Sequence, residues 1–333
     1  MKILLTGGAG YIGSHCALVL AQAGYMPVIL DNFDNSSPEV GQALKVLTDN
    51  NVIVIEGDVR KTDLVINVLK EHKIEAVIHL AGLKSVNDSM TQPIHYYDVN
   101  VGGTISLIKA MQSCGIKKLI FSSSATVYGE PKYLPYDENH PTNPINVYGS
   151  TKLAVEHILK DLCLSDAQWQ VAALRYFNPV GAHESGLIGE RPRGTPNNLM
   201  PYLLQVASNI LPKLRIFGDD YETIDGTGAR DYIHVMDLAR GHLAALSFLE
   251  NMSAYHVFNL GTGHATTVLE LVGAFEQVNQ LKIPYEIVGR RPGDLPTYYA
   301  TPDKAADVLK WSAIESLESI CASSWNWQKN QPS

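Results

Sequence analysis

A glycine-rich turn near the start of the chain is the feature that most constrains its fold. The turn reads Gly7-Gly8-Ala9-Gly10-Tyr11-Ile12-Gly13, between a short apolar run at residues 2–6 and a helical pattern at 11–23. Glycines at these spacings permit a tight turn, a close approach of backbone amides to a diphosphate, and close packing of helix on sheet. The N-terminus of the helix also attracts negative charge. The motif therefore predicts a parallel α/β fold that binds a dinucleotide.

The residue pair that ends the second apolar run indicates which dinucleotide is bound. Residues 26–30 form this run, and Asp31 and Asn32 follow it. A carboxylate at this distance from the glycine turn can accept a hydrogen bond from a ribose 2′-hydroxyl. It would repel a 2′-phosphate, so the sequence favours NAD over NADP.

Strand and helix patterns alternate through the first half of the chain. Strands are expected at residues 2–6, 26–30, 52–55, 76–80, 118–121 and 171–174, and helices at 11–23, 61–72, 97–113 and 147–165. Such alternation predicts a Rossmann-like, doubly wound parallel sheet. Asp58 and Val59 follow the third strand, and Leu80 to Lys84 follow the fourth, at the strand ends where cofactors bind. The alternative for Asp58 is a cap on the next helix.

After residue 176 the sequence changes to loops rich in glycine, proline and asparagine, as in Asn178-Pro179-Val180-Gly181. This change predicts a smaller second lobe. We expect an NAD-binding domain at 1–176 and mainly a substrate domain at 177–333, with some segments returning to the first domain.

Composition excludes several classes of partner. The net charge of −8 gives no overall attraction to nucleic acid or anionic lipid, and no apolar stretch approaches the length of a membrane span. The four cysteines are scattered without the close spacing of a metal or redox site. We therefore expect a cytoplasmic protein without a metal site.

Tyr148 and Lys152 are the candidates for proton transfer. They lie four residues apart in a helical stretch, so their side chains share one face. A neighbouring ammonium stabilises a phenolate, and we therefore expect Lys152 to lower the pKa of Tyr148. Ser122-Ser123-Ser124 follows the expected strand at 118–121 and supplies hydroxyls for a hydrogen-bonding relay. A tyrosine base beside a dinucleotide site is typical of hydride transfer at a carbinol carbon.

Together these motifs resemble the extended short-chain dehydrogenase/reductase family, and within it the branch that epimerises nucleotide sugars. The glycine turn marks the whole family, whereas Asn197-Asn198-Leu199-Met200-Pro201 and Arg230-Asp231-Tyr232-Ile233-His234-Val235 are similar to the epimerase branch. The resemblance implies interconversion of UDP-galactose and UDP-glucose, a reaction of galactose metabolism. Tyr148 would remove the proton of the sugar 4-hydroxyl while a resident NAD takes up and returns hydride at carbon four. Lys152 would hold the nicotinamide ribose, and Ser124 would bridge the tyrosine and the reacting oxygen.

The resemblance also assigns a cofactor site and a substrate site. Motif and resemblance together place NAD against Gly7, Gly10, Tyr11, Ile12, Gly13, Asp31, Asn32, Asn35, Ser36, Asp58, Val59, Leu80, Ala81, Gly82, Lys84, Asn100, Ser122, Tyr148, Lys152 and Phe177. The UDP-sugar is expected against Ser124, Tyr148, Asn178, Asn198, Leu199, Ile216, Phe217, Arg230, Arg291, Asp294 and Tyr298.

Four further expectations follow from the resemblance. A bulky residue at the position of Tyr298 is associated with enzymes restricted to glucose and galactose, which points to unmodified sugars. A homodimer is implied, paired through helices near 90–113 and 147–165. Relatives often have two asparagines where this chain reads Asp98-Val99-Asn100, so only Asn100 can take the cofactor-side role. Arg215 replaces a commonly small or apolar residue, and we leave it out of the site.

Other functions share parts of this pattern. An epimerase for other UDP-sugars would use the same groups. A nucleotide-sugar 4,6-dehydratase typically has a Thr-Asp-Glu run where this chain reads Ser124-Ala125-Thr126. A non-catalytic NAD-sensing regulator on the same fold would be expected to lack the tyrosine or the lysine. An ordinary dehydrogenase would release its reduced cofactor.

Overall fold

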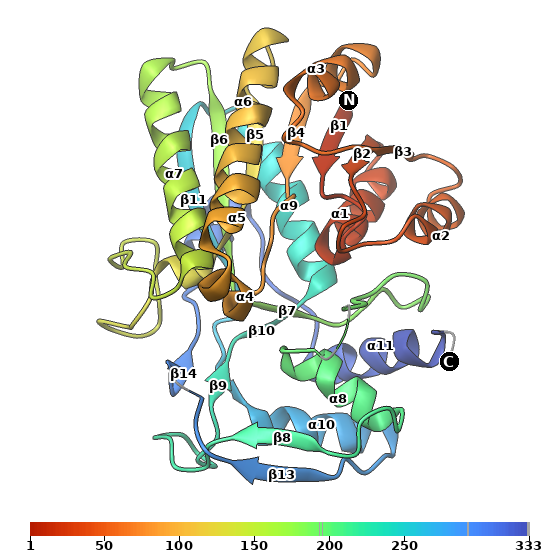
Figure 1. The fold of residues 1–333 in the computed structure, drawn as a ribbon, viewed down its shortest axis with the longest axis vertical. Helices are drawn as coiled ribbons and strands as arrows, with labels where there is room; N and C mark the ends of the chain where they lie inside the picture. The colour runs from red at the N-terminus through yellow and green to blue at the C-terminus, as the bar shows by residue number, and fades with distance from the viewer. Residues whose placement is uncertain (193, 195, 292, 332–333) are drawn as a thin grey trace.

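The larger lobe is built on a seven-stranded parallel sheet (Figure 1). The computed structural model describes residues 1–192, 194, 196–291 and 293–331. The strands of this sheet are β1 (Lys2–Thr6), β2 (Met26–Asp31), β3 (Ile53–Glu56), β4 (Ala76–His79), β5 (Lys118–Ser124), β6 (Gln170–Tyr176) and β11 (Ala254–Leu260). Their order across the sheet is β11-β6-β5-β4-β1-β2-β3. All carboxyl ends therefore meet at one edge of the sheet.

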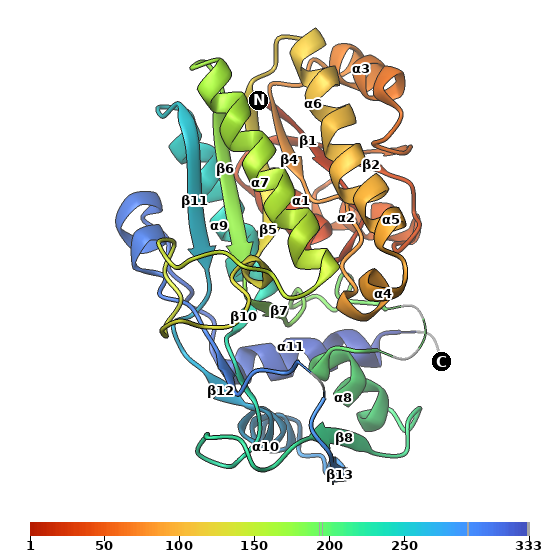
Figure 2. The same ribbon diagram turned by 60° about the vertical axis from the view of Figure 1, so that its left-hand side comes forward.

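Helices cover both faces of this sheet, which explains why its strands are apolar almost throughout. One face carries α1 (Tyr11–Gln22), α2 (Glu39–Leu47) and α9 (Val235–Leu249), and the other carries α3 (Thr62–Glu71), α6 (Gly103–Ser113) and α7 (Val147–Ser165). Figure 2 shows α6 and α7 in front of the strands and α9 behind them. Leu4 and Leu5 illustrate the pattern, because these neighbours are fully buried in different core clusters.

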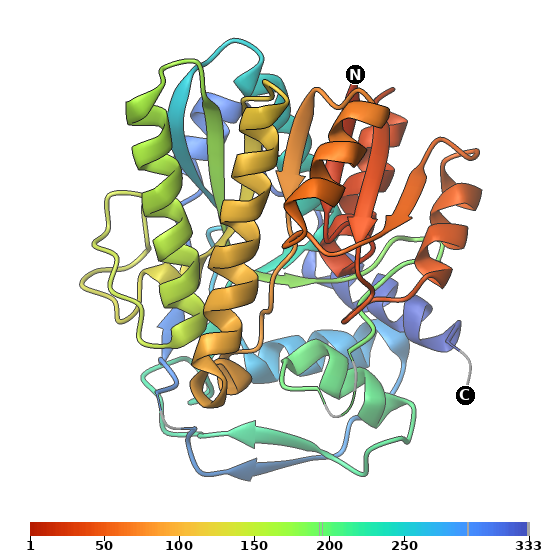
Figure 3. The same ribbon diagram turned by 45° about the horizontal axis from the view of Figure 1, so that its top comes forward.

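The smaller lobe lies beyond the carboxyl ends of the strands (Figure 3). Its helices are α8 (Leu199–Ala207), α10 (Val268–Asn279) and α11 (Leu317–Lys329), and its strands are β8 (Leu214–Phe217), β9 (Ala229–Arg230), β12 (Thr266–Thr267), β13 (Tyr285–Val288) and β14 (Thr297–Tyr298). Strands β7 (Asn178–Val180) and β10 (Tyr232–His234) pair between the lobes. The remaining elements are α4 (Val86–Thr91), α5 (Pro93–Tyr96), the helical turns η1 (Tyr97–Gly102) and η2 (Ala125–Val127), and η3 (Ala305–Leu309).

The structure confirms the predicted doubly wound fold and moves some boundaries. Strand β5 continues to Ser124, because Ser122 to Ser124 pair with the end of β6 rather than forming a loop. The helix expected at 97–113 begins with the wider turn η1 before α6. Strand β11 pairs with β6, so a segment from beyond residue 177 completes the large sheet. None of the helices described is long and apolar enough to cross a lipid bilayer.

A buried ion pair connects α7 to the sheet. The Arg175 guanidinium donates to both carboxylate oxygens of Glu156, at 3.0 Å and 2.7 Å, and both side chains are buried. The hydroxyls of Ser123 and Tyr255 donate to the same carboxylate. Arg175 also lies over the ring of Tyr128, with Cζ 4.8 Å from the ring centre. The buried charges of Arg175 and Glu156 are therefore compensated by each other together with these neighbouring hydroxyls and the Tyr128 ring.

We expect Glu156→Gln to lower the free energy of unfolding by about 3–5 kcal/mol, because it leaves a buried guanidinium without its counter-charge. Urea denaturation of the variant and the wild type measures this loss. Glu286→Gln is the matched control, since Glu286 pairs with Lys213 on the exposed surface. Its loss should stay within about 1 kcal/mol. Equal losses in the two variants would contradict the role given to the buried pair.

Candidate active site

The glycine turn forms a narrow cradle at the carboxyl end of β1. Gly7 has a φ of +71°, and a Cβ placed on it would lie 2.6 Å from the backbone nitrogen of Ala81. A Cβ on Gly13 would lie 2.6 Å from the carbonyl oxygen of Gly7. Only glycine lets the backbone pass this close, and α1 begins directly after Gly10. The cradle fits a dinucleotide, whose diphosphate would face the N-terminus of α1.

Asp31 holds the cradle in place from the end of β2. Its carboxylate accepts hydrogen bonds from the backbone nitrogens of Ala9 and Phe33, both at 2.9 Å, and from the hydroxyl of Ser36 at 2.9 Å. Asn32 and Asn35 lie exposed beside it. The predicted ribose partner therefore also fixes the geometry of the glycine loop.

Asp58 lies at the end of β3 in an exposed charge cluster. Its carboxylate pairs with Arg60 at 2.6 Å, and Arg60 also pairs with Asp98 at 2.7 Å. The hydrogen bonds from Arg60 lower the pKa of Asp58. The cap of α3 is Lys61, so the alternative role of Asp58 as the helix cap is wrong. Val59 is buried beside it.

Asn100 braces the loop that follows β4. Its side-chain oxygen accepts from the backbone nitrogen of Leu83 at 2.8 Å, and its amide donates to the carbonyl of Leu83 and the hydroxyl of Thr151. Asn100 thereby connects the loop of residues 80–84 to helix α7. The ammonium of Lys84 pairs with Glu190 at 2.6 Å.

Tyr148, Lys152 and Ser124 meet beside this loop. The Lys152 ammonium donates to the backbone oxygen of Ser122 at 2.7 Å and lies 5.8 Å from the centre of the Tyr148 ring. The Ser124 hydroxyl accepts from the nitrogen and hydroxyl of Thr126, and a hydrogen bond between Ser124 and the Tyr148 phenol lowers the pKa of the phenol. The three predicted catalytic side chains are thus brought together, and an ideal Cβ on Gly82 would lie 3.7 Å from Lys152 Nζ.

Burial dominates the protonation of this group. It raises the pKa of Tyr148 to about 12, although the hydrogen bond from Ser124 acts in the opposite direction. Burial also lowers the pKa of Lys152 to about 8, while the carboxylate of Glu156 raises it. The expected lowering of the tyrosine pKa is therefore wrong for this structure, because desolvation of the buried phenol is the largest influence on it and raises it.

Aromatic rings close the site on the side of the small lobe. Tyr298 packs against Tyr136 and Phe177, with ring centres 4.8 Å and 5.4 Å apart. The Tyr298 hydroxyl is buried and has no hydrogen-bond partner among the described residues. Asn178 begins strand β7 beside these rings. An unpartnered hydroxyl at this position is available to a polar ligand.

Two arginines lie further out in the small lobe. Arg230 pairs with Asp294 and donates to the carbonyl of Ala229. The Arg291 guanidinium stacks on the ring of Phe217, with Cζ 3.8 Å from the ring centre. Ile216, the residue before Phe217 on strand β8, is buried in the core of the smaller lobe. The two arginines could hold a diphosphate, because a guanidinium binds phosphate oxygens through its planar fork.

Asn198 and Leu199 begin helix α8 at the edge of this region. Asn198 is the N-cap residue, yet its side chain makes no capping hydrogen bond to the described part of the helix. Arg215 lies exposed 4.0 Å from Glu286, with its guanidinium 5.6 Å from the Phe217 ring.

Sequence reasoning missed two residues of the site. Glu190 reaches back to Lys84 from a loop of the second lobe, and Tyr136 packs against Tyr298 from the loop after β5, with the two rings tilted by 57°. No spacing in the sequence signals either contact, because each joins segments far apart in the chain. Within the described residues, no group of three or more histidine, cysteine or carboxylate side chains could hold a metal ion.

Comparison with known proteins agrees with this geometry. A family model described as the NAD dependent epimerase/dehydratase family matches residues 3–261. The chain is similar to the UDP-glucose 4-epimerase of Bacillus subtilis (strain 168), with 52% identity over 330 residues that cover 99% of this chain and 97% of that protein. It is 50% identical to the UDP-glucose 4-epimerase of Mus musculus over 339 residues, or 100% and 98% of the two chains.

Solved structures give the same result. The UDP-glucose 4-epimerase of Bifidobacterium longum, in complex with NAD+ and UDP, superposes with a TM-score of 0.95 at 48% identity and 99% coverage of both chains. The enzyme of Stenotrophomonas maltophila, with bound NAD and formylated UDP-arabinopyranose, has a TM-score of 0.97 at 46% identity, covering 99% of this chain and 98% of the other. These matches confirm the resemblance inferred from the motifs. The cradle, the tyrosine–lysine pair and the full-length similarity together establish that this chain belongs to the NAD dependent epimerase/dehydratase family.

Proposed function

We propose that this protein interconverts UDP-galactose and UDP-glucose by transient oxidation at sugar carbon four. The observation that carries the proposal is the cluster of Tyr148, Ser124 and Lys152 beside a glycine cradle. The relatives named above are UDP-glucose 4-epimerases over the full length of the chain. Bound NAD supplies the hydride acceptor and donor.

Tyr148 is the proposed base and Ser124 its relay. The phenol faces Ser124, so the serine can pass a proton between the tyrosine and the sugar 4-hydroxyl. Because burial holds the pKa of Tyr148 near 12, its ionised form needs positive charge nearby. The Lys152 ammonium, 5.8 Å from the centre of the Tyr148 ring, would supply this charge, and it also lies within reach of the loop after β4, where a nicotinamide ribose would bind.

The small lobe would hold the UDP in place while the sugar rotates to present its other face to the cofactor. Arg230 and Arg291 are the proposed diphosphate partners, and Asp294 would release Arg230 for this role. Tyr298 fills the space beside the sugar with its ring, which favours unmodified glucose and galactose over N-acetylated sugars. We propose that residues 1–176 bind NAD and that 177–333 mainly bind the UDP-sugar.

Replacing Tyr148 by phenylalanine should lower kcat by about 10²- to 10⁴-fold, since it removes the base and leaves the ring. Purified protein without added NAD is incubated with UDP-galactose, and UDP-glucose is measured by chromatography. Tyr285→Phe is the control, because Tyr285 is exposed on β13. Full activity in the Tyr148 variant would refute the assigned base.

The buried Lys152 predicts a dependence of stability on pH. Its pKa is about 8 when folded and 10.5 when unfolded, so between these values the unfolded chain binds a proton that the folded chain does not. Stability from this group therefore rises with pH across that window. Without NAD, Lys152→Met should be more stable than the wild type below pH 8, by about 3 kcal/mol, with the difference lost by pH 10.5.

Urea denaturation at several pH values measures this difference between the variant and the wild type. The control is Lys160→Met, an exposed lysine on the same helix. Its difference from the wild type should not change with pH. A constant difference for Lys152→Met would show that its ammonium is not desolvated as described.

We also propose a homodimer and a cytoplasmic location. Apolar side chains are exposed along one set of helices, with Met90 57%, Ile94 80% and Leu164 77% accessible. Burial of such a surface is what a stable dimer requires. All four cysteines are free thiols, as is usual for reducing compartments.

Light scattering should give a wild-type mass of twice 36.5 kDa. Ile94→Glu should shift it toward 36.5 kDa, because a carboxylate would be buried without a partner. The control Ile314→Glu changes a residue that is also exposed, at 76%, but lies outside these helices. A monomeric wild type would refute the dimer.

A further inference from the structure

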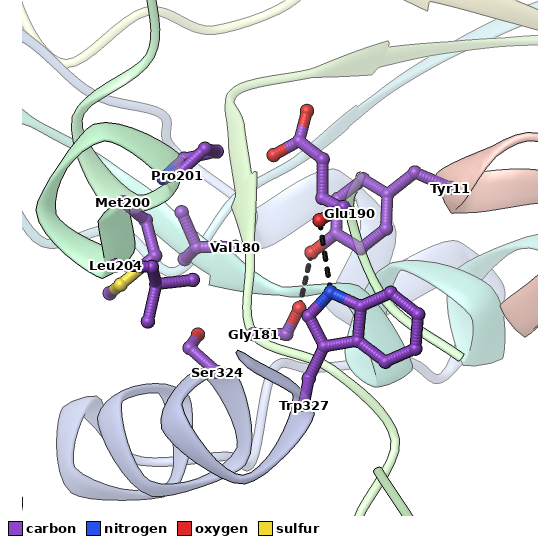
Figure 4. Close-up of a pocket in the computed structure, with 9 residues that line it drawn as sticks. All are labelled: Tyr11, Val180, Gly181, Glu190, Met200, Pro201, Leu204, Ser324 and Trp327. Carbon is purple, nitrogen blue, oxygen red and sulfur yellow. Dashed lines mark hydrogen bonds between the residues drawn. The ribbon is translucent and has the colours of Figure 1, made fainter. Parts of the chain in front are cut away.

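A small cavity lies where the two lobes meet, lined in part by Tyr11, Gly181 and Trp327 (Figure 4). The Tyr11 hydroxyl donates to the carbonyl of Gly181 at 2.6 Å, and the Trp327 indole donates to the carbonyl of Glu190 at 3.0 Å. These two hydrogen bonds lie side by side at the cavity. The space holds about one water molecule, so it is too small for a second ligand. The smaller lobe instead carries an unassigned group of charges, around Phe217 on strand β8.

Arg215 shares the outward face of strand β8 with Phe217. Side chains alternate along a strand, and Leu214 and Ile216 take the inner positions in the core of the smaller lobe. The side chain of Arg215 is 54% exposed, and its Cζ lies 5.6 Å from the centre of the Phe217 ring. The Cζ of Arg291 lies 3.8 Å from the centre of the same ring. Two guanidinium groups, from two separate segments of the chain, therefore approach one aromatic ring.

These two guanidinium groups are close enough to repel each other. Burial lowers the pKa of Arg291, the carboxylate of Asp294 raises it, and the charge of Arg215 lowers it again. An anion bound beside both groups would offset this repulsion, because a nearby negative charge favours the charged form of each arginine.

The carboxylates paired with this group do not balance its positive charge. Glu286 lies 4.0 Å from Arg215, but it also pairs with Lys213 at 2.5 Å. Asp294 pairs with Arg230. The group therefore has four cations and two carboxylates, an excess of two positive charges: Lys213, Arg215, Arg230 and Arg291 against Glu286 and Asp294. In a chain of net charge −8, such a local excess attracts anions to this part of the surface.

We infer that Arg215 is a further binding residue for the UDP-sugar and that its charge acts together with that of Arg291 on the diphosphate. The inference rests on the proposed function, in which Arg291 is a diphosphate partner. A diphosphate replaces the repulsion between the two guanidinium groups by an attraction to both. Because Arg215 is exposed to solvent, salt should weaken its attraction for the diphosphate, whereas salt would not weaken a packing contact.

The test measures the binding of UDP to the purified protein carrying NAD, by isothermal titration calorimetry. Arg215→Gln removes the charge and keeps a polar side chain, whereas Arg215→Lys keeps the charge. At about 50 mM NaCl, Arg215→Gln should bind UDP roughly two- to fivefold more weakly than the wild type, as expected for one exposed ion pair. At about 1 M NaCl this difference should vanish, because charges are then screened within about 3 Å. Arg215→Lys should stay close to the wild type, and Glu286→Gln should bind UDP more tightly, since it removes a competing carboxylate.

Lys282→Gln is the matched control, because it removes an exposed cation of the smaller lobe that pairs with Glu276 outside this group. Its affinity for UDP should equal that of the wild type. Uridine, which carries no phosphate, should bind to the wild type and to Arg215→Gln equally. A weaker affinity of Arg215→Gln for uridine, a loss for UDP that persists at high salt, or no loss for UDP at low salt would each overturn the inference. A wild type that does not bind UDP would instead refute the proposed function itself.

Discussion

The glycine cradle can form only because the backbone of Gly7 lies directly against the end of β4. A single added Cβ would come within 2.6 Å of the nitrogen of Ala81. That contact fixes the start of α1, and the Asp31 carboxylate holds the same loop through the nitrogen of Ala9. The glycine loop thus fixes the sheet edge, the N-terminus of α1 and the loop after β4 relative to one another. Every other group of the site is placed relative to it.

Burial of charge is the second constraint. Lys152 is placed under the sheet edge with one carbonyl partner, and desolvation lowers its pKa to about 8. One turn further along α7, Glu156 supplies negative charge and is itself neutralised by Arg175. Positive and negative charges therefore alternate from Lys152 through Glu156 to Arg175, between the candidate active site and the core. A site that needs a poised lysine accepts a cost in stability to keep it there.

The cradle, Tyr148 with Lys152, and most strands could be predicted from the sequence, because each depends on spacing within one element. Helix α7 has the bounds expected for it, 147–165. The pKa of Tyr148 could not be predicted, since it depends on how deeply the surrounding segments bury the phenol. The end of strand β5 could not be predicted either. The polar residues 122–124 resemble a loop in the sequence, and only their pairing with β6 shows that they continue the strand.

The sequence by itself determined the fold class and the placement of Tyr148 and Lys152 on one helix face, and it favoured NAD over NADP as the cofactor. These follow from local chemistry: glycines where no Cβ fits, a carboxylate after a strand, and two side chains one helical turn apart. Only the tertiary structure decided which distant groups meet. Lys84 and Glu190 are 106 residues apart, and the Trp327 indole of the C-terminal helix donates to the carbonyl of Glu190. No local pattern encodes such contacts, because they arise where two lobes close on one another.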